Sequence, residues 1–196
     1  MALSLVTAPA VEPLTLADAK GHLRVDVADE DGLIDDLIRA AREYVESFTH
    51  RALITQTWDD KRDGFPCWFA PIDLPKPPTS SVTSISYIDT NGTTQTWSSS
   101  LYTTDLPAGP LALMARVTPV YQQIYPVTRD IVNAVAVRFV AGYGADGDSV
   151  PASIRAAMKI LIATWYRPAR EAVQIGNLVT QIPYTVDALL WPYKVW

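Results

Sequence analysis

The order of segment types along the chain constrains its fold more than any other feature. An acidic stretch with helical spacing, residues 29–51, leads directly into the alternating segment Ile54–Asp59. A proline-punctuated region with strand patterns continues to about residue 144, and a second strong helical pattern opens at Pro151. This order predicts an α+β fold, in which helices from both chain ends form one core and the β region between them forms a separate lobe.

The N-terminal part, residues 14–51, is predicted to be helical. Thr15 and Asp18 have the spacing of a capping box at the start of a short first helix. The second helix, within 29–51, has one wide apolar stripe made by Leu33, Ile34, Leu37, Ile38, Ala41, Tyr44, Val45 and Phe48. Residues 1–13 show no periodicity and are interpreted as an N-terminal arm.

Region 53–144 carries the strand signals. Asn91-Gly92 stands between Val82–Ile88 and Thr93–Trp97, which predicts a β-hairpin. Further strands are expected at Leu111–Val117 and Val132–Ala141. Most of the fifteen prolines lie between Pro66 and Pro126, and they predict short strands and ordered loops because proline cannot donate to a central ladder.

The C-terminal part begins with a helix over residues 150–167, which Pro151 opens and Pro168 is expected to end. Residues 172–196 are apolar without periodicity, and three aromatic residues lie among the last six. Such side chains often anchor interfaces, so this tail either docks on another chain or folds back onto its own domain. The predicted anchors are Leu189, Leu190, Trp191, Tyr193 and Trp196. The whole chain, 1–196, is expected to form one domain.

The net charge of −5 is unevenly distributed. Ten acidic residues and three arginines lie between Asp26 and Asp60, a local balance of −7, which leaves +2 for the rest. Such a stretch argues against a DNA-gripping surface, which needs lysine or arginine at the phosphates. It fits either a solvated helix face or a surface along which DNA slides without adhering.

Candidate catalytic residues are few. The only histidines, His22 and His50, stand at expected helix ends, where histidine usually caps the helix or faces water. The single cysteine, Cys67, lies among aromatic residues and is interpreted as a core filler. No metal-binding pattern and no apolar run long enough for a transmembrane helix occurs, and the first residues lack the basic start of a secretory signal. A small cytosolic enzyme using His22 or His50 with a carboxylate remains an alternative.

Several sequence segments, taken together and in their order, carry a family resemblance. They are Pro13–Lys20 with His22–Val25; Tyr44–Glu46 with Arg51 and Thr55–Trp58; Leu74–Pro78 with Val82–Tyr87; Val135–Gly144 with Val150, Pro151 and the helix through Trp165 and Tyr166; and Val186–Leu190 with Pro192 and Tyr193. This pattern, spread over about residues 13–193, resembles the phage head–tail connector (adaptor) family of long-tailed phages and gene transfer agents.

The resemblance implies a structural protein without catalytic residues or cofactors. Adaptors of this family form a ring, usually dodecameric, beneath the portal protein, extend the DNA channel and present a surface to a stopper or tail-completion protein below. It also implies a place in the neck of a virion or phage-like particle assembled in the bacterial cytoplasm, with no membrane partner. A stopper or tail-completion protein is the nearest structural alternative.

The family supplies no site residues, so the sites are predictions from this sequence alone. The C-terminal anchors are assigned to the portal or a neighbouring subunit. The acidic residues are assigned to the channel or its rim, where double-stranded DNA passes without specific binding; they are Asp29, Glu30, Asp31, Asp35 and Asp36.

Overall fold

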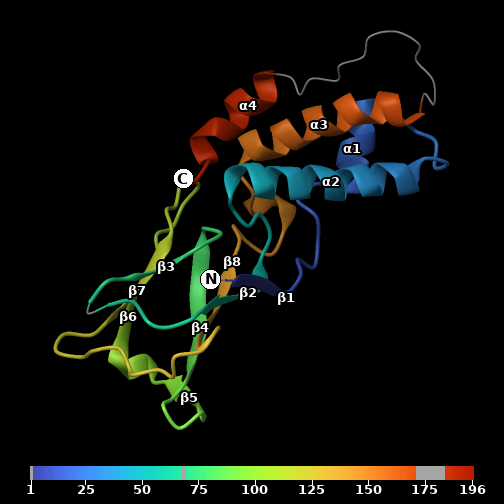
Figure 1. Ribbon diagram of the computed structural model, residues 1–196. Helices are drawn as coiled ribbons and strands as arrows, with labels where there is room; N and C mark the ends of the chain where they lie inside the picture. Colours follow the sequence, from blue (N-terminus) through green and yellow to red (C-terminus); the bar gives the residue numbers. More distant parts are fainter. Residues whose placement is uncertain (1, 68, 171–183) are drawn as a thin grey trace. The chain divides into compact units, whose positions relative to one another are not determined.

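The computed structural model describes residues 2–67, 69–170 and 184–196 (Figure 1). The chain forms two compact units. The helical unit comprises residues 11–54 and 144–196, and the β unit comprises residues 1–10 and 55–143. Because the helices before and after the central region share one unit, and the strands of residues 55–143 belong to the other, the predicted α+β architecture is confirmed.

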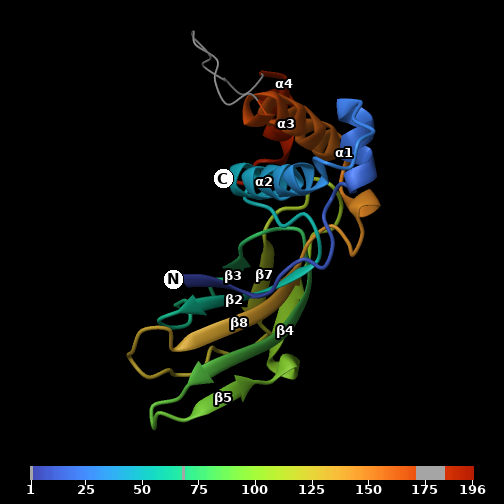
Figure 2. The ribbon, with the colours of Figure 1, turned by 90° about the vertical axis from the view of Figure 1, so that its right-hand side faces the viewer.

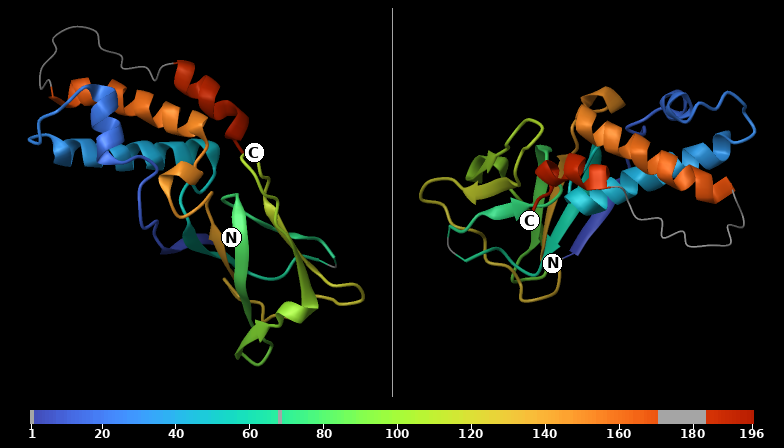
Figure 3. Two further views of the ribbon diagram at one scale, coloured as in Figure 1. Left: turned by 180° about the vertical axis from the view of Figure 1, so that it is seen from behind. Right: turned by 90° about the horizontal axis from the view of Figure 1, so that it is seen from above.

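Four helices build the helical unit: α1 (Leu16–Leu23), α2 (Asp31–Thr49), α3 (Ala152–Arg170) and α4 (Tyr184–Leu190). Figure 3 shows α3, in orange, beside both α2 and the red α4, in agreement with the residue contacts between these helices. The expected apolar stripes supply the core. Its fully buried side chains include Ile34, Ile38, Val45, Ile154, Met158, Leu161, Ile162, Val186 and Leu190.

The first helix begins with the predicted capping box. The backbone N–H of Asp18 donates to the Thr15 hydroxyl over 3.0 Å, and the Asp18 carboxylate accepts from the Thr15 backbone N–H over 3.2 Å. The side-chain hydrogen bond from Thr15, followed by the one from its backbone, holds the pKa of Asp18 below its ordinary value. The cap therefore depends on an ionised carboxylate.

Two expectations about the C-terminal helices were wrong. Helix α3 continues past Pro168 to Arg170, because a proline in the last turn removes only one backbone hydrogen bond. Helix α4 was not expected, because seven residues are too few to show a period. Its two buried residues, Val186 and Leu190, nevertheless stand four apart, as an amphipathic helix requires. Residues 172–183 of the predicted tail lie outside the described residues.

The β unit contains two antiparallel sheets. One has the order β1 (Ala2–Thr7), β2 (Gln56–Arg62), β8 (Val135–Ala141), β4 (Thr79–Ile88) and β5 (Thr94–Trp97). The other has the order β3 (Ile72–Leu74), β7 (Ala115–Pro119) and β6 (Tyr102–Asp105). Figure 2 shows β2, β8, β4 and β5 side by side, with β3 and β7 behind them.

Both sheets contribute to the core of the β unit. Phe65 stacks on Tyr125, and Trp97 of the first sheet contacts Tyr102 of the second at 5.0 Å between ring centroids. Arg62 on β2 donates to the backbone carbonyl of Asp73 on β3. The fully buried apolar side chains come from both sheets and include Ile72, Leu74, Ile85, Ala115, Val117, Val135, Val137 and Phe139.

The hairpin predicted around Asn91-Gly92 is confirmed as β4 and β5, and the Asp89 carboxylate accepts from the backbone N–H groups of Asn91 and Thr93 inside the turn. The N-terminal arm is corrected in part, because Ala2–Thr7 forms strand β1 and pairs with β2. Its order comes from a partner more than fifty residues away, which local periodicity does not reveal. Strand β7 begins at Ala115 rather than Leu111, and β6 was missed.

Candidate assembly surfaces

The structure gives the histidines and Cys67 no catalytic setting. His22 lies exposed in the last turn of α1, and His50 is the exposed left-handed residue that ends α2, so their predicted place at helix ends is confirmed. Cys67 is exposed in the loop between β2 and β3, so its interpretation as a core filler was wrong. Aromatic residues are its neighbours in the sequence, but they do not bury its thiol.

Within residues 2–67, 69–170 and 184–196, no three His, Cys, Asp or Glu side chains gather in a way that could hold a metal ion. In the same ranges, every helix falls short of the length and apolarity needed to cross a bilayer.

A group of side chains that includes two exposed tryptophans lies where the C-terminal tail meets the end of α2. We call Phe48, Trp191, Lys194 and Trp196 the aromatic tail cluster. Trp191 and Trp196 meet edge to face at 5.5 Å between ring centroids, and they are 58% and 80% exposed. The Lys194 ammonium stands 4.4 Å from the Trp196 ring centroid and 4.9 Å from that of Phe48. Large aromatic side chains held in contact yet exposed to water are typical of a binding surface.

The tail that carries this cluster is fixed to the end of α2. The backbone N–H of Val195 donates to the carbonyl of Thr49 over 3.0 Å, and the buried Arg51 donates from Nε to the carbonyl of Tyr193 over 2.5 Å. Leu190 adds a fully buried side chain. The tail is therefore held by both apolar and polar contacts within its own unit.

Buried charges support the same region of α2. Glu46 accepts the backbone N–H of Leu53 over 2.9 Å and pairs with Arg42 at 3.2 Å. Arg42 also pairs with Glu12 at 2.8 Å. Burial acts to lower the pKa of Arg42, but the hydrogen bond and charge of Glu12 outweigh it and raise that pKa. These pairs connect α2 to the segments on both sides of it in the sequence.

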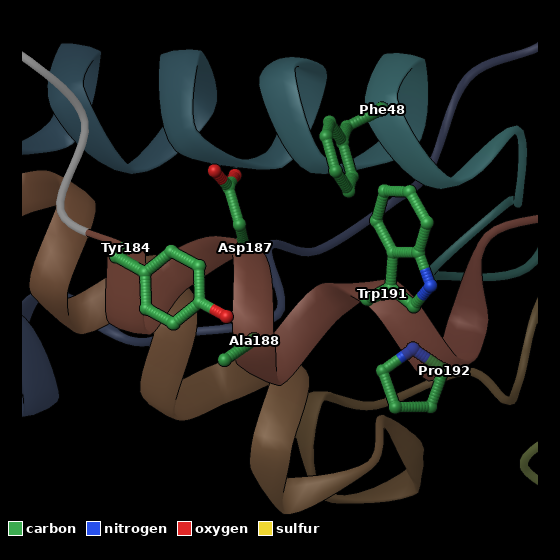
Figure 4. A pocket seen from close by; sticks show the side chains of 6 residues that line it. All are labelled: Phe48, Tyr184, Asp187, Ala188, Trp191 and Pro192. Carbon is green, nitrogen blue, oxygen red and sulfur yellow. The ribbon is translucent and has the colours of Figure 1, made fainter.

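A pocket of about 490 Å³ lies beside the aromatic tail cluster. Figure 4 shows Phe48 of α2 facing Trp191, with the Asp187 carboxylate directed toward α2. Burial, and then the charge of Asp187, raise the pKa of the nearby Tyr44. The walls are mainly apolar with one carboxylate, and they are formed by Phe48, Tyr184, Asp187, Ala188, Trp191 and Pro192.

The predicted tail anchors occupy different environments. Trp191 and Trp196 are exposed, Leu189 and Tyr193 are partly exposed, and Leu190 is buried. Leu190 thus holds the tail to its own unit and does not present a surface to a partner. Phe48 and Lys194 complete the cluster and were not predicted as site residues. Phe48 belonged to the apolar stripe of its helix, which gave no sign that its ring lies at the surface end of that stripe.

The five residues of the predicted acidic site differ in their exposure and in their partners. Asp29 and Asp36 are exposed, and Asp36 pairs weakly with Arg39 at 3.7 Å. Asp31 pairs with Lys20 at 2.6 Å. Glu30 accepts a hydrogen bond from the Tyr166 hydroxyl of α3. Glu30 and Asp31 therefore contribute to contacts between helices, whereas the negative surface depends mainly on Asp29, Asp35 and Asp36.

Part of the chain matches a known protein family. Residues 13–104 match the family model of the phage gp6-like head-tail connector protein, which confirms the resemblance predicted from the sequence. No curated protein matches the chain.

Several solved structures share the fold over the whole length of this chain. A chain from the neck of an empty gene transfer agent (GTA) particle, computed with C6 symmetry, has a TM-score of 0.80 and 23% identity, and 96% of it is covered. A chain from the virion of a native GTA particle has a TM-score of 0.79 and 24% identity, with 96% covered. A chain from the neck of a native GTA particle, computed with C12 symmetry, has a TM-score of 0.77 and 22% identity, and 96% of it is covered. All three cover 100% of this chain, and at these identities the likeness shows a shared fold.

Proposed function

We propose that the chain is an adaptor subunit of the head–tail connector in a phage-like particle. One observation carries the proposal. The segment that matches the connector family lies within a chain whose entire length has the fold of a GTA neck protein. The subunit would form a ring beneath the portal, extend the DNA channel and present its lower face to a stopper or tail-completion protein. Assembly would take place in the bacterial cytoplasm.

The C6 and C12 symmetries of the related necks support a cyclic arrangement. A cyclic ring needs two different surfaces on each subunit, because each copy contacts one neighbour on either side. The subunit then needs further surfaces for the proteins above and below it. The aromatic tail cluster and the acidic residues of this chain are separate surfaces that could serve different contacts.

The aromatic tail cluster is the surface we assign to the portal or to a neighbouring subunit. Trp191 and Trp196 are pre-positioned by the anchoring of the tail, so their docking would cost little ordering entropy. Leu189 and Tyr193 flank them with partly exposed side chains. Lys194 suits a partner surface that supplies a carboxylate beside an apolar patch.

We assign Asp29, Asp35 and Asp36, together with Glu30 and Asp31, to the channel or its rim. Carboxylates there would repel phosphates and prevent the strong, salt-dependent adhesion that basic side chains would cause. The location of these residues in an assembled ring tests this assignment. If the ring places them on its outer wall, the assignment is wrong.

Attachment to the cognate portal tests the function. The full-length chain and the double variant Trp191→Ala/Trp196→Ala are mixed with the portal, and bound protein is measured by sedimentation. Deletion of the tail is a poorer variant, because it also removes the buried Leu190. Phe69→Ala, an exposed aromatic change in the β unit, is the matched control.

We expect the wild-type chain and the control to co-sediment with the portal and the double variant to lose attachment. A wild-type chain that binds only a portal already carrying another neck protein would instead be a stopper or tail-completion protein. Failure to bind either form would overturn the proposed function. Equal binding by the double variant would remove the tail from the interface.

A further inference from the structure

The pocket beside the aromatic tail cluster combines aromatic walls with one carboxylate. Tyr184 and Ala188 of α4 stand one helical turn apart, Trp191 follows directly after the helix, and Phe48 of α2 completes the apolar wall. Tyr184 is 84% exposed, so its ring lies open to a ligand. Asp187 also lines the pocket and directs its carboxylate toward α2 (Figure 4). The pocket therefore offers aromatic rings and a negative charge to the same ligand.

The carboxylate of Asp187 carries a charge that the described part of the chain does not neutralise. Asp18, Asp31 and Glu46 in the same unit each pair with a lysine or an arginine. Among the described residues, no basic side chain lies within ion-pair distance of Asp187. Burial, followed by the charge of Asp187, raises the pKa of Tyr44, which places the carboxylate close to that phenol. A partly buried carboxylate beside apolar walls is stabilised by a cation from outside.

A lysine or arginine side chain fits both properties of this pocket. Its charge pairs with a carboxylate, and its stem or guanidinium packs on aromatic rings. The chain already shows such contacts, because the Lys194 ammonium stands 4.9 Å from the ring centroid of Phe48 and 5.8 Å from that of Trp191. Since Lys194 takes these two rings, the place left for an incoming cation lies beside Asp187 and Tyr184.

The source of that cation is a different chain rather than a second copy of this one. The chain has a net charge of −5. Most of its described lysine and arginine side chains already pair with its own carboxylates. Arg51 is buried, and Lys76 stands over the ring of Trp58. A second copy thus has few basic side chains to offer. Of the two partners assigned to this surface, a neighbouring subunit and the portal, the portal remains.

We propose that the pocket receives a basic side chain of the portal protein, which pairs with the Asp187 carboxylate and packs on the aromatic walls. The inference rests on the proposed adaptor function and adds the chemistry by which its partner is recognised. The tail would then contribute both apolar contact area, through Trp191 and Trp196, and one charge-dependent contact. A contact of this kind selects the correct partner more than it adds affinity.

Charge substitution at Asp187 tests this contact. Asp187→Asn keeps the shape of the side chain and removes its charge, Asp187→Glu keeps the charge, and Asp187→Lys reverses it. Each variant is titrated onto the cognate portal, and native mass spectrometry counts the copies on each portal. Asp105→Asn, the same change at an exposed site of the β unit, is the matched control. Circular dichroism and the melting temperature of each free variant check its folding.

Attachment of the first copy should weaken at least about tenfold with Asp187→Asn and be lost with Asp187→Lys. Asp187→Glu and the control should bind like the wild type. The advantage of the wild type over Asp187→Asn should shrink at high salt, which a packing defect would not show.

Wild-type attachment by Asp187→Asn and Asp187→Lys contradicts the contact and leaves the adaptor function standing. Equal losses with Asp187→Glu and Asp187→Asn would show that the charge is not recognised, and they would overturn the proposal. A loss confined to portals that carry several copies would assign the cation to a neighbouring subunit and overturn it as well. A wild-type chain that does not bind the portal contradicts the adaptor function itself.

Discussion

The two units of this protein are held together in different ways. The helical unit joins segments far apart in the chain through an apolar core and a few buried polar contacts, above all those of Glu46 and Arg51 near the returning tail. The β unit relies on strand register and a shared aromatic core around Phe65, Trp97 and Tyr125. The helical unit thus depends on a few polar contacts at particular residues, whereas the stability of the β unit is spread over many packed residues. Substitutions in the two units should therefore have different effects on the free energy of unfolding and on binding.

The largest expected effect lies in the β unit. Phe139 is fully buried on β8, the central strand of the larger sheet, so Phe139→Ala should cost about 3–5 kcal/mol of unfolding free energy. Urea denaturation followed by tryptophan fluorescence measures it. Phe69→Ala, at an exposed site, should change stability by less than about 0.5 kcal/mol. A loss below about 1 kcal/mol for Phe139→Ala would mean that the core does not depend on this strand.

The aromatic tail cluster should show a large effect on binding and a small one on folding. Trp196→Ala should weaken attachment to the portal by about 2 kcal/mol, roughly 30-fold, as expected for a central interface tryptophan. Its melting temperature should remain close to that of the wild type, because this side chain is 80% exposed. A large drop in melting temperature would assign the side chain to the core of the helical unit instead.

Glu46 provides the next effect. Glu46→Ala removes the acceptor of the Leu53 N–H and one carboxylate partner of Arg42, so the helical unit should lose about 1–3 kcal/mol. Glu46→Gln keeps an acceptor at the same reach and should lose less. Thermal unfolding followed at 222 nm compares the two. Equal losses would show that the charge, and not the hydrogen bond to Leu53, supports the tail junction.

The smallest effect concerns pH. The hydrogen bonds from Arg138 hold the pKa of Asp59 below its ordinary value, across the register pair that joins β2 and β8. A carboxylate with a lowered folded pKa stabilises the fold above its unfolded pKa of about 4, and this contribution is lost as the pH falls through the lower folded value. The β unit should thus weaken slightly on acidification. Asp59→Asn should show a smaller difference between pH 6 and pH 3 in urea unfolding than the wild type, and an equal difference would contradict this role.

Local signals predicted much of this fold from the sequence. The stripe around Ile34 and Ile38 marked α2, the spacing of Thr15 and Asp18 marked the cap of α1, and Asn91-Gly92 marked the hairpin, because each depends on residues close in sequence. Strand β1 was not predicted, since its order depends on pairing with β2. Helix α4 was missed because it is short.

The candidate surfaces were predicted less completely, for a physical reason. Composition identified Trp191 and Trp196, but it could not show that Leu190 faces inward or that Lys194 and Phe48 join them. Nor could sequence show that Lys20 and Tyr166 engage Asp31 and Glu30, because those contacts form only when the helices pack. Which side chains remain exposed to water is decided only when the helices pack into a core.

Electron cryomicroscopy of the chain mixed with its cognate portal is the decisive measurement of the proposed adaptor function. We expect a closed ring of this subunit on the portal, coaxial with the DNA channel, with density for the helical and β units in each subunit. A portal that remains bare at saturating concentrations of a folded chain, or a complex in which this protein forms no ring, would contradict it.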